Sequence, residues 1–433
     1  MLRAYKYRLY PNKKQAEKLQ WVLDRNRELY NAALQERRDA YCMAHISIGY
    51  NQQAAQLPEI KEIREEYAGI HSQVLQDTLR RVDKAFNAFF RRVKNGEKAG
   101  YPRFQHYGRY DSFTFPQSGF SLTEENRVCL SKIGTIKGKF PRGKKANPPQ
   151  GTMKTCTVKR EGHHWYVIFT CEVEQELVYH ESEEAVGIDL GLLHFATLSD
   201  GRTIENPRHL RTSEQKLKKL QEVLSRKKRG SKRRRKAAQV VGKNHRHIAC
   251  QRKDFQHKEA RKLVKSYQSI VFEKLHPANM SRRPRPKQDE ATGQYVPNGA
   301  SAKAGLNKSI LDASWGQFQQ LCQNKAECAG SRVLFVSPNY TSQMCSGCGV
   351  IARKELNERW HSCSCGCSLD RDHNAAINIK RAGIAVLKKE AQARTEPSED
   401  APLRSPRLEP WGVVTNFRPK TQKNYNGASF KLA

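Results

Sequence analysis

The chain opens with a regular alternation of apolar and cationic residues. Tyr5, Tyr7 and Leu9 alternate with Lys and Arg, which is the period-two pattern of a β-strand with one apolar and one cationic face. Pro11 ends the pattern. No other strand pattern lies nearby, so we expect residues 1–10 to complete a sheet formed by strands farther along the chain.

Two helical patterns follow the opening strand. Asn12 and Gln15 have the spacing of a capping box, and apolar residues then recur every three or four positions, which predicts a helix over about 13–38. A second helix begins near Leu75 and carries arginines beside its apolar stripe. We expect residues 11–105 to be a helical region whose arginines either face solvent or contact phosphates. These arginines are Arg80, Arg81, Arg91 and Arg92.

After Gly100 the pattern changes to short aromatic and β-branched runs separated by basic turns. Such runs at short intervals predict a small β-barrel or sandwich. We expect residues 106–182 to form most of this barrel, with the opening strand completing it. The helical region would then be an insertion in the barrel.

From about residue 183 onward, apolar strands alternate with helices, which is typical of an α/β domain. Two of these strands, Ala185–Leu190 and Ser269–Phe272, are apolar apart from a carboxylate within or just after the run. Residues 277–305 are rich in Pro, Gly, Ser and Asn, so we expect a mobile loop there. The Pro-rich residues after 386 predict a disordered tail.

The charge balance narrows the function. Lys and Arg number 78 against 43 Asp and Glu, giving a formal net charge of +35, which excludes most ordinary metabolic enzymes. Such an excess most often indicates a nucleic-acid partner; an anionic membrane is less favoured, because no lipidation motif or isolated amphipathic anchor is present. With no membrane span and no apolar signal region, we expect a prokaryotic cytoplasmic protein associated with the nucleoid.

The densest basic segment is Arg226–Lys236, with nine cations in eleven residues. It is a candidate clamp for a nucleic-acid strand. A solvated or disordered stretch, like a nuclear-localisation signal, is the alternative.

Five of the twelve cysteines fall between Cys345 and Cys367, which favours metal binding over disulfides in a cytoplasmic chain. Two cysteines at each end of a hairpin offer four thiolates to a tetrahedral zinc, and such a site is closed and structural. The second pair is separated by one residue instead of two, so Cys367 and His361 remain alternative fourth ligands. The predicted zinc ligands are Cys345, Cys348, Cys363 and Cys365.

Three carboxylates stand at unusual positions: Asp189 and Glu273 in or after apolar strands, and Asp372 in a polar motif before a helix. An ionised carboxylate in an apolar strand costs several kcal/mol unless it is paired. Each alone could pair with a lysine or cap a helix. Together they could hold two Mg²⁺ or Mn²⁺ ions that activate water for phosphodiester hydrolysis.

Four motifs, in this order, resemble TnpB, the transposon-associated relative of type V CRISPR nucleases. They are Val-Gly-Ile-Asp-Leu-Gly, Ile-Val-Phe-Glu-Lys-Leu, Thr-Ser-Gln-Met-Cys-Ser-Gly-Cys-Gly and Asp-Arg-Asp-His-Asn-Ala-Ala-Ile-Asn-Ile. The N-terminal Tyr-Lys-Tyr-Arg-Leu-Tyr-Pro-Asn is similar too, so the match covers roughly residues 1–385.

The resemblance implies a multidomain α+β protein, in which a RuvC-like nuclease of the RNase H fold (α/β) is interrupted by a zinc ribbon. A β-barrel wedge domain containing a helical recognition insert precedes the nuclease. Applied to this sequence, the segments are the wedge barrel (1–10 and 106–182), the recognition insert (11–105), the RuvC-like domain (183–339 and 368–385), the zinc ribbon (340–367) and the tail (386–433).

The resemblance also implies RNA-guided cleavage of double-stranded DNA next to a short transposon-adjacent motif. The guide RNA would derive from the transposon end, and we expect a monomeric ribonucleoprotein without a membrane partner. Matched to the family motifs, the magnesium-binding catalytic residues are Asp189, Glu273 and Asp372, with structural zinc on the four cysteines. Asp370 is the rival of Asp372, but we expect it to orient Arg371 or cap the following helix. The alternatives are a nucleic-acid-binding regulator or transposase accessory protein without nuclease activity, and a DNA transposase proper.

Overall fold

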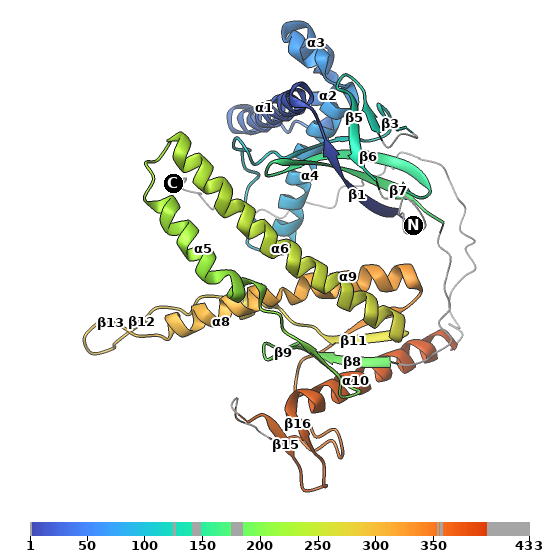
Figure 1. Cartoon of the computed structure of the whole chain (residues 1–433), viewed down its shortest axis with the longest axis vertical. Coiled ribbons are helices and arrows are strands. Elements are labelled where there is room, and N and C mark those ends of the chain that lie inside the picture. Colours follow the sequence, from blue (N-terminus) through green and yellow to red (C-terminus); the bar gives the residue numbers. More distant parts are fainter. Residues whose placement is uncertain are drawn as a thin grey trace, which may run out of the picture. The chain divides into compact units, whose positions relative to one another are not determined.

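The computed structural model describes residues 2–123, 127–140, 149–174, 185–352, 355 and 358–395 (Figure 1). The chain divides into two compact units, Met1–Gly383 and Ile384–Ala433. Both large sheets and all but the last helical turns lie in the first unit. The protein is therefore a mixed α+β structure, as the sequence predicts.

The first sheet has seven antiparallel strands in the order β2-β6-β7-β1-β5-β4-β3. Strand β1 (Leu2–Tyr10) lies inside it and pairs with two strands from far along the chain, which confirms the prediction for the opening strand. Tyr5, Tyr7 and Leu9 are buried, and Lys6 and Arg8 alternate with them. The other strands are β2 (Ser112–Phe115), β3 (Phe120–Leu122), β4 (Arg127–Leu130), β5 (Gly134–Lys139), β6 (Thr152–Glu161) and β7 (His164–Glu172).

The predicted closed barrel does not form among the described residues. The end strands β2 and β3 are only three or four residues long and form no hydrogen bonds with each other. Instead, the rings of Phe115 and Phe120 approach to 6.5 Å between centroids, so side chains rather than a ladder join the two ends of the sheet. Residues 141–148 and 175–184, which belong to the predicted barrel, lie outside the described residues.

The helical region packs on this sheet and shares its apolar core. Helix α1 (Lys13–Ala44) begins with the predicted capping box of Asn12 and Gln15 and runs farther than expected. Helix α4 (Ser72–Lys94) buries Leu75, Leu79 and Val82, the start of its predicted stripe. Between them lie α2 (Tyr50–Ala55), α3 (Leu57–Ile63) and the 3₁₀ turn η1 (Glu65–Gly69).

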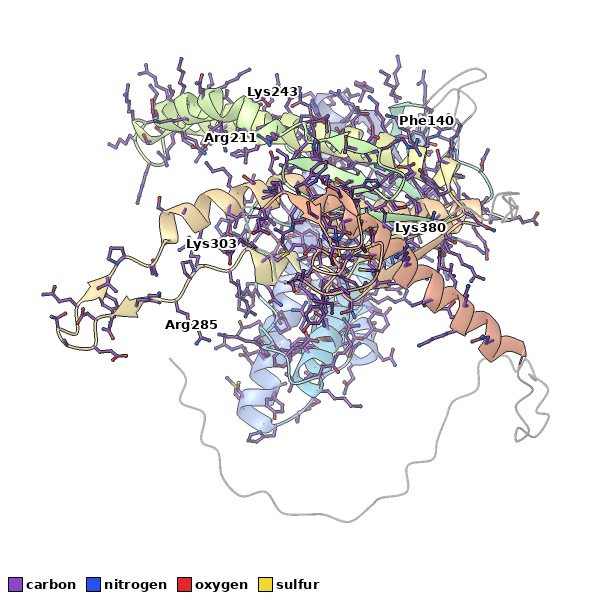
Figure 2. The ribbon with its side chains drawn as sticks, turned by 90° about the horizontal axis from the view of Figure 1, so that it is seen from below. Phe140, Arg211, Lys243, Arg285, Lys303 and Lys380 are labelled. Atoms are coloured by element: carbon purple, nitrogen blue, oxygen red, sulfur yellow. The ribbon has the colours of Figure 1, made fainter. Side chains whose placement is uncertain are left out.

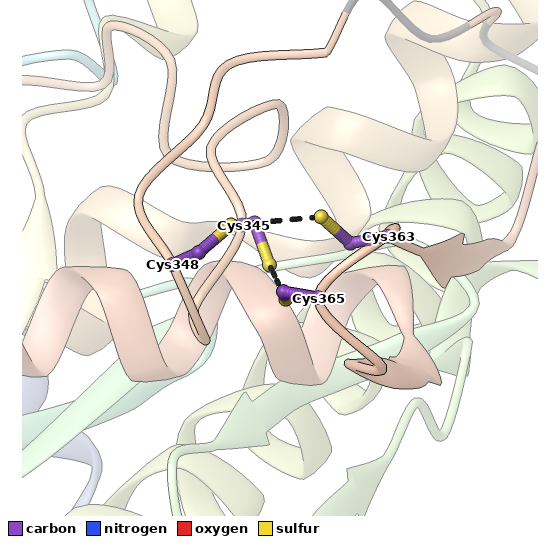
Figure 3. Close-up of side chains that lie close together, drawn as sticks. All are labelled: Cys345, Cys348, Cys363 and Cys365. Carbon is purple, nitrogen blue, oxygen red and sulfur yellow. Dashed lines mark hydrogen bonds between the residues drawn. The ribbon is translucent and has the colours of Figure 1, made fainter.

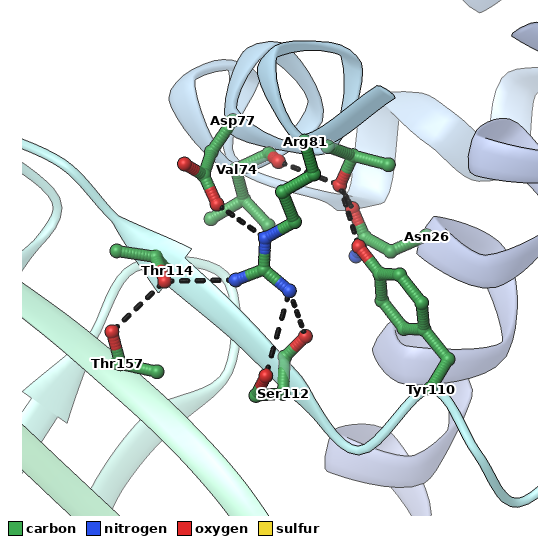
Figure 4. Close-up of polar contacts among 9 residues, drawn as sticks. Asn26, Val74, Asp77, Arg81, Tyr110, Ser112, Thr114 and Thr157 are labelled. Atoms are coloured by element: carbon green, nitrogen blue, oxygen red, sulfur yellow. Dashed lines mark hydrogen bonds and ion pairs between the residues drawn. The ribbon is translucent and has the colours of Figure 1, made fainter. Parts of the chain in front are cut away.

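Arg81 joins α4 to the sheet (Figure 4). Its guanidinium donates to Asp77 at 2.9 Å, to the carbonyl of Ser112 at 2.7 Å and to the hydroxyl of Thr114 at 2.9 Å. All its nitrogens therefore have partners inside the protein. Arg81 is a structural residue, which neither the solvated nor the phosphate-binding interpretation anticipated.

The second sheet has five strands in the order β10-β9-β8-β11-β14. Strands β8 (Ala185–Asp189), β11 (Ser269–Glu273) and β14 (Arg332–Val336) are parallel, whereas β9 (His194–Leu198) and β10 (Thr203–Glu205) form an antiparallel extension. Helices α6 (Lys232–Ser266) and α9 (Trp315–Ala329) share its apolar core, α10 (Arg371–Thr395) lies against β8 and β11, and α5 (His209–Ser225) packs on α6. The predicted α/β organisation of this region is confirmed.

The region expected to be a mobile loop, 277–305, contains short helices and strands, so the prediction of a continuous loop was wrong. It contains α7 (Pro277–Met280), a hairpin of β12 (Lys287–Gln288) and β13 (Tyr295–Val296), and the start of α8 (Ala300–Ala313). Lys303 donates to the carbonyl of Met280 at 2.8 Å, which ties α8 to α7. Its Pro, Gly and Asn residues therefore form turns between short elements, and Figure 2 shows Arg285 and Lys303 on this segment.

The basic segment Arg226–Lys236 is also ordered. It forms the turn between α5 and α6 and the first residues of α6, with Ser231 as the N-cap. Arg234 bridges the turn by donating to the carbonyls of Leu224 at 2.8 Å and Lys227 at 3.1 Å. Most of the other cations of the segment are exposed, and Figure 2 shows charged side chains along this helical hairpin, including Arg211 and Lys243.

Helix α10 continues to Thr395, past the predicted start of the tail at residue 386. Residues 386–395, the start of the predicted tail, are therefore helical. The remainder of the predicted tail, 396–433, lies outside the described residues.

Candidate metal centres

Asp189 and Glu273 lie at the same edge of the second sheet. Each is the last residue of its strand, and β8 and β11 are parallel neighbours with Phe272 opposite Ile188. Asp189 follows Ile188 and Glu273 follows Phe272, so the pairing of the two strands places the two acids side by side. Both strands are buried up to that residue, and both acidic residues are half-buried.

Asp372 reaches the same place from helix α10. It lies in the first turn of the helix. Its carboxylate lies close to Gly191, two residues after Asp189: a Cβ added to Gly191 would be 3.9 Å from Oδ2 of Asp372. The structure thus brings all three predicted carboxylates to one edge of the sheet.

Asp370 has a different task from Asp372. Its Oδ1 accepts hydrogen bonds from the backbone N–H groups of Asp372 at 2.8 Å and His373 at 3.2 Å. This is an N-cap, so the expectation that Asp370 caps the helix is confirmed. Arg371 instead donates to the carbonyls of Glu355 and Glu358.

Two glycines allow α10 to lie directly on the sheet. A Cβ on Gly187 of β8 would overlap the backbone of α10 at Ala376 and stand 2.9 Å from the Cα of Lys380. On the helix, a Cβ on Gly383 would stand 3.0 Å from the Cβ of Val271 in β11. The position of Asp372 therefore depends on contacts that only glycine permits.

The three carboxylates lie in an environment that disfavours their charge. Burial, followed by the nearby Glu273 and Asp372, raises the pKa of Asp189 to about 8. Burial also raises the pKa of Glu273, although a hydrogen bond from Thr341 partly offsets it. The pKa of Asp372 is raised by burial and by Asp370. Such a cluster is unfavourable unless cations or protons neutralise it.

The carboxylates are less tightly grouped than the cysteines. Two groups of described residues have three or more possible metal-ligand atoms within 4.8 Å of one another, and both groups lie in the cysteine region.

Thr341 is a residue of this site that sequence reasoning missed. It is buried, and its hydroxyl donates to Oε1 of Glu273 and also contacts the carbonyl of Pro338 at 3.3 Å. Gln319 of α9 donates to the backbone carbonyl of Glu273 at 3.2 Å. The signal was present in the motif beginning at Thr341, but its connection to Glu273 is visible only in the fold.

The four predicted zinc ligands converge (Figure 3). The Sγ atoms of Cys345 and Cys365 are 3.6 Å apart, as are those of Cys348 and Cys363, and all four lie within 4.8 Å of one another. The second pair lies in the turn between β15 (Trp360–Ser362) and β16 (Ser368–Asp370). No disulfide forms among the described cysteines.

The two alternative ligands also lie close to Cys345. The sulfur of Cys345 forms a second set of possible ligands with His361 and Cys367. Hydrogen bonds, first from the backbone of Cys348 and then from His361, lower the pKa of Cys345 to about 5, which favours the thiolate that zinc requires. His361 is fully buried, as expected of a residue that orients a ligand.

Two asparagines of α10 hold the cysteine region against the helix. Asn374 accepts from the backbone N–H of Ser346 and donates to the carbonyl of Met344, both at 2.8 Å. Asn378, one turn later, donates to the carbonyls of Thr341 and Met344. Both side chains are buried. They link the two candidate metal centres, and sequence reasoning assigned them no role.

No helix in the described part of the chain is both long and apolar enough to cross a membrane.

Comparison with known proteins places this architecture in a family. Residues 1–43 match a family model described as "Helix-turn-helix domain", residues 168–283 one described as "Probable transposase" (IS605 OrfB), and residues 315–379 one described as "Cas12f1-like, TNB domain". A protein of Escherichia coli K12 named "Putative RNA-guided DNA endonuclease InsQ" is 33% identical over 391 residues, covering 89% of this chain and 93% of the relative. The chain belongs to the TnpB (IS605 OrfB) family.

A second TnpB relative, "Putative RNA-guided DNA endonuclease" of Streptomyces pristinaespiralis, is 32% identical and covers 89% of this chain and 90% of its own length. Among solved structures, a Cas12f1–sgRNA–target DNA complex aligns with 88% of this chain and 99% of its own at 16% identity, with a TM-score of 0.31. Two of the family models cover the candidate residues. Asp189 and Glu273 lie within the match to the transposase model, and the four cysteines and Asp372 lie within the match to the TNB-domain model.

Proposed function

We propose that this chain is an RNA-guided endonuclease that cleaves double-stranded DNA next to a short transposon-adjacent motif. The observation that carries the proposal is the meeting of Asp189, Glu273 and Asp372 at one sheet edge. The names of the two bacterial relatives support the same activity. The guide RNA would derive from the transposon end, and the protein would act as a monomeric ribonucleoprotein.

The topology supports a RuvC-like nuclease of the RNase H fold. Three parallel strands extended by an antiparallel pair, with acids at the carboxyl ends of the first two parallel strands, suit such a centre. We assign residues 183–339 and 368–385 to this domain and 340–367 to the zinc ribbon. The open seven-stranded sheet would be the wedge domain, and residues 11–105 its recognition insert.

The three carboxylates fit divalent cations by their chemistry. Hard oxygen ligands are those that Mg²⁺ and Mn²⁺ prefer, and the raised pKa of Asp189 indicates that the protein's own cations do not offset the burial and mutual repulsion of the carboxylates. When bound, two such ions supply an activated water and stabilise the leaving oxygen of the phosphodiester. The residues that would hold them are Asp189, Glu273 and Asp372.

The chain's own residues position these ligands. The hydroxyl of Thr341 fixes one carboxylate oxygen of Glu273 and favours its ionised form. Asp370 fixes the first turn of α10 and thereby the backbone that carries Asp372. The positions are therefore established by the fold before any substrate binds.

Structural zinc on Cys345, Cys348, Cys363 and Cys365 is the second part of the proposal. Four thiolates leave no open position for water, so this metal would stabilise the ribbon and not catalyse. Metal analysis of the purified protein should give about one zinc per chain. Cys345→Ser should lower that content and unfold the ribbon, whereas Cys250→Ser, at an exposed cysteine of α6, should change neither.

The positive charge would grip the guide RNA and the target DNA through their backbones, while base pairing reads the sequence. The exposed cations of the α5–α6 turn are the proposed strand clamp.

The test of the proposed activity is cleavage by the ribonucleoprotein. Protein purified with its RNA should cut a plasmid that carries the sequence matching that RNA, and sequencing the RNA identifies the guide. Asp189→Ala should abolish cutting and leave RNA and DNA binding intact. Asp254→Ala, at an exposed acid of α6, is the matched control and should cut normally. Binding without any cutting by the wild-type protein in Mg²⁺ would instead establish the regulator, and strand-transfer products would establish a transposase.

A further inference from the structure

The C-terminal end of α4 and the loop that follows carry a group of exposed aromatic rings. The exposed fraction is 59% for Phe90, 47% for Tyr101, 46% for Phe104 and 63% for Tyr107. Large aromatic side chains gathered in one exposed segment usually mark an interaction site. We call the set Phe89, Phe90, Tyr101, Phe104 and Tyr107 the aromatic surface.

Ring contacts and backbone anchors make this surface a defined structure. Phe89 lies 5.3 Å from Phe90 and 5.5 Å from Tyr101 between ring centroids. The loop is fixed to α1 by a reciprocal pair of hydrogen bonds, in which Asn31 donates to the carbonyl of Gln105 at 3.1 Å and accepts from its N–H at 2.8 Å. Phe104 and Tyr107 are therefore presented by an anchored loop.

The same segment is strongly basic. Residues 86–109 contain six Lys or Arg and one acidic residue. All six cations are exposed, and none forms an ion pair with a described residue. They are Arg91, Arg92, Lys94, Lys98, Arg103 and Arg109.

Exposed rings among exposed cations match one kind of partner best. Nucleic-acid strands offer flat base faces that stack on aromatic rings and phosphates that pair with cations. A second copy of this chain would bring like charges together at the same surface. Residues 396–433 also carry more Lys and Arg than Asp and Glu, so that segment is a poor electrostatic match too.

We propose that the aromatic surface binds the unpaired bases of a nucleic-acid strand by stacking, with the neighbouring cations holding its phosphates. The inference deepens the proposed function, because it names a contact surface for the nucleic-acid partner. Unpaired RNA and unpaired DNA share this chemistry, so the experiment includes both.

The test uses the full-length chain with Asp189→Ala, so that no cleavage is required. The probes are a single-stranded RNA and a DNA of the same sequence, each containing 2-aminopurine, an adenine analogue whose emission falls when it stacks. Phe90→Ala and Tyr107→Ala remove exposed rings without opening the core. Tyr295→Ala removes an equally exposed ring from β13 and is the matched control.

Emission should fall on binding, and each ring variant should weaken affinity about tenfold and reduce the quenching. The salt dependence of affinity should stay unchanged for the ring variants. The double variant Arg91→Gln with Arg92→Gln should instead reduce the slope of log affinity against log salt by about 1.4. The tighter of the two probes identifies which strand is the partner.

Ring variants that bind and quench as the wild type does would overturn the inference. Light scattering provides a second check: if the ring variants abolished self-association without affecting the probes, the surface would be a protein–protein interface. Neither result bears on cleavage by the wild-type ribonucleoprotein. Conversely, an absence of cleavage would leave the stacking measurement valid.

Discussion

Replacing Gly187 with Ala perturbs the contact that sets the position of α10. The added Cβ would overlap the α10 backbone at Ala376 and stand 2.9 Å from the Cα of Lys380. Ordinary van der Waals contact begins near 3.4 Å, so relieving that one contact requires the helix to move outward by at least about 0.5 Å. Side-chain rotation cannot relieve the overlap, because the atoms in the way are backbone.

The expected cost follows from that geometry. Overpacking of a core typically costs about 1 to 3 kcal/mol, and a rigid backbone obstacle favours the upper end. For a domain of this size, about 3 kcal/mol corresponds to a fall in melting temperature of roughly 6 to 12 °C. Asp372 moves with its helix, and a displacement of about 1 Å at a reacting centre can cost about a hundredfold in rate. We therefore expect cleavage to fall by more than tenfold.

Thermal unfolding and plasmid cleavage measure the two effects. Gly242→Ala is the matched control, because this glycine lies inside helix α6 with no atom within 4 Å of the added Cβ. It should raise stability by about 0.5 to 1 kcal/mol and leave cleavage unchanged. If Gly187→Ala melted and cut as the wild type does, the close packing of α10 on β8 would not position Asp372.

Three further predictions concern the residues around the carboxylates. The raised pKa of Asp189 means that folding favours its protonated form, so without divalent metal the wild type should lose stability as pH rises from about 4 to about 8. Asp189→Asn should therefore melt at a higher temperature than the wild type at pH 8.5 but not at pH 4. Equal melting temperatures of the two proteins at both pH values would refute this. Asp370→Ala should lower the free energy of unfolding by about 1 kcal/mol because the helix loses its N-cap, whereas Asp370→Asn should be about as stable as the wild type. An equal loss of stability in both variants would mean that the charge of Asp370, and not its capping hydrogen bond, stabilises the helix. Thr341→Val removes the hydrogen-bond donor to Glu273 and should raise the pKa of Glu273, which would move the acidic limb of the cleavage pH profile to higher pH. Thr341→Ser keeps the hydroxyl and should leave the limb at its wild-type position. A limb that does not move in Thr341→Val would contradict the role of this hydrogen bond.

The sequence predicts those parts of the site that local patterns control. Glu273 directly follows an apolar run and Asp189 lies within one, so the sequence predicts that both acids belong to strands, and only the structure shows that each strand ends at its acid. Four cysteines in two close pairs likewise need only a hairpin to meet. The family resemblance distinguished Asp372 from Asp370, and the N-cap role then left for Asp370 is one that a carboxylate just before a helix commonly takes.

The remaining features depend on contacts between distant segments. The sequence pattern of Asn374 and Asn378 is that of any polar helix face, and only the fold shows them holding Met344 and Ser346. The sequence alone predicts a surface cation at Arg81, and only the fold shows that β2 lies beside it and accepts its hydrogen bonds. The predicted loop 277–305 failed because turn residues also connect very short strands and helices, which composition cannot distinguish from disorder.

The central claim is that three carboxylates at one sheet edge perform metal-dependent DNA cleavage. The most direct measurement is the Mg²⁺-dependent cleavage rate of ribonucleoproteins carrying Asp189→Asn, Glu273→Gln or Asp372→Asn, which keep the shape of each side chain and remove its charge. Each rate should fall below about one-hundredth of the wild-type rate while target binding persists. Cleavage at the wild-type rate by any one of the three would contradict the account.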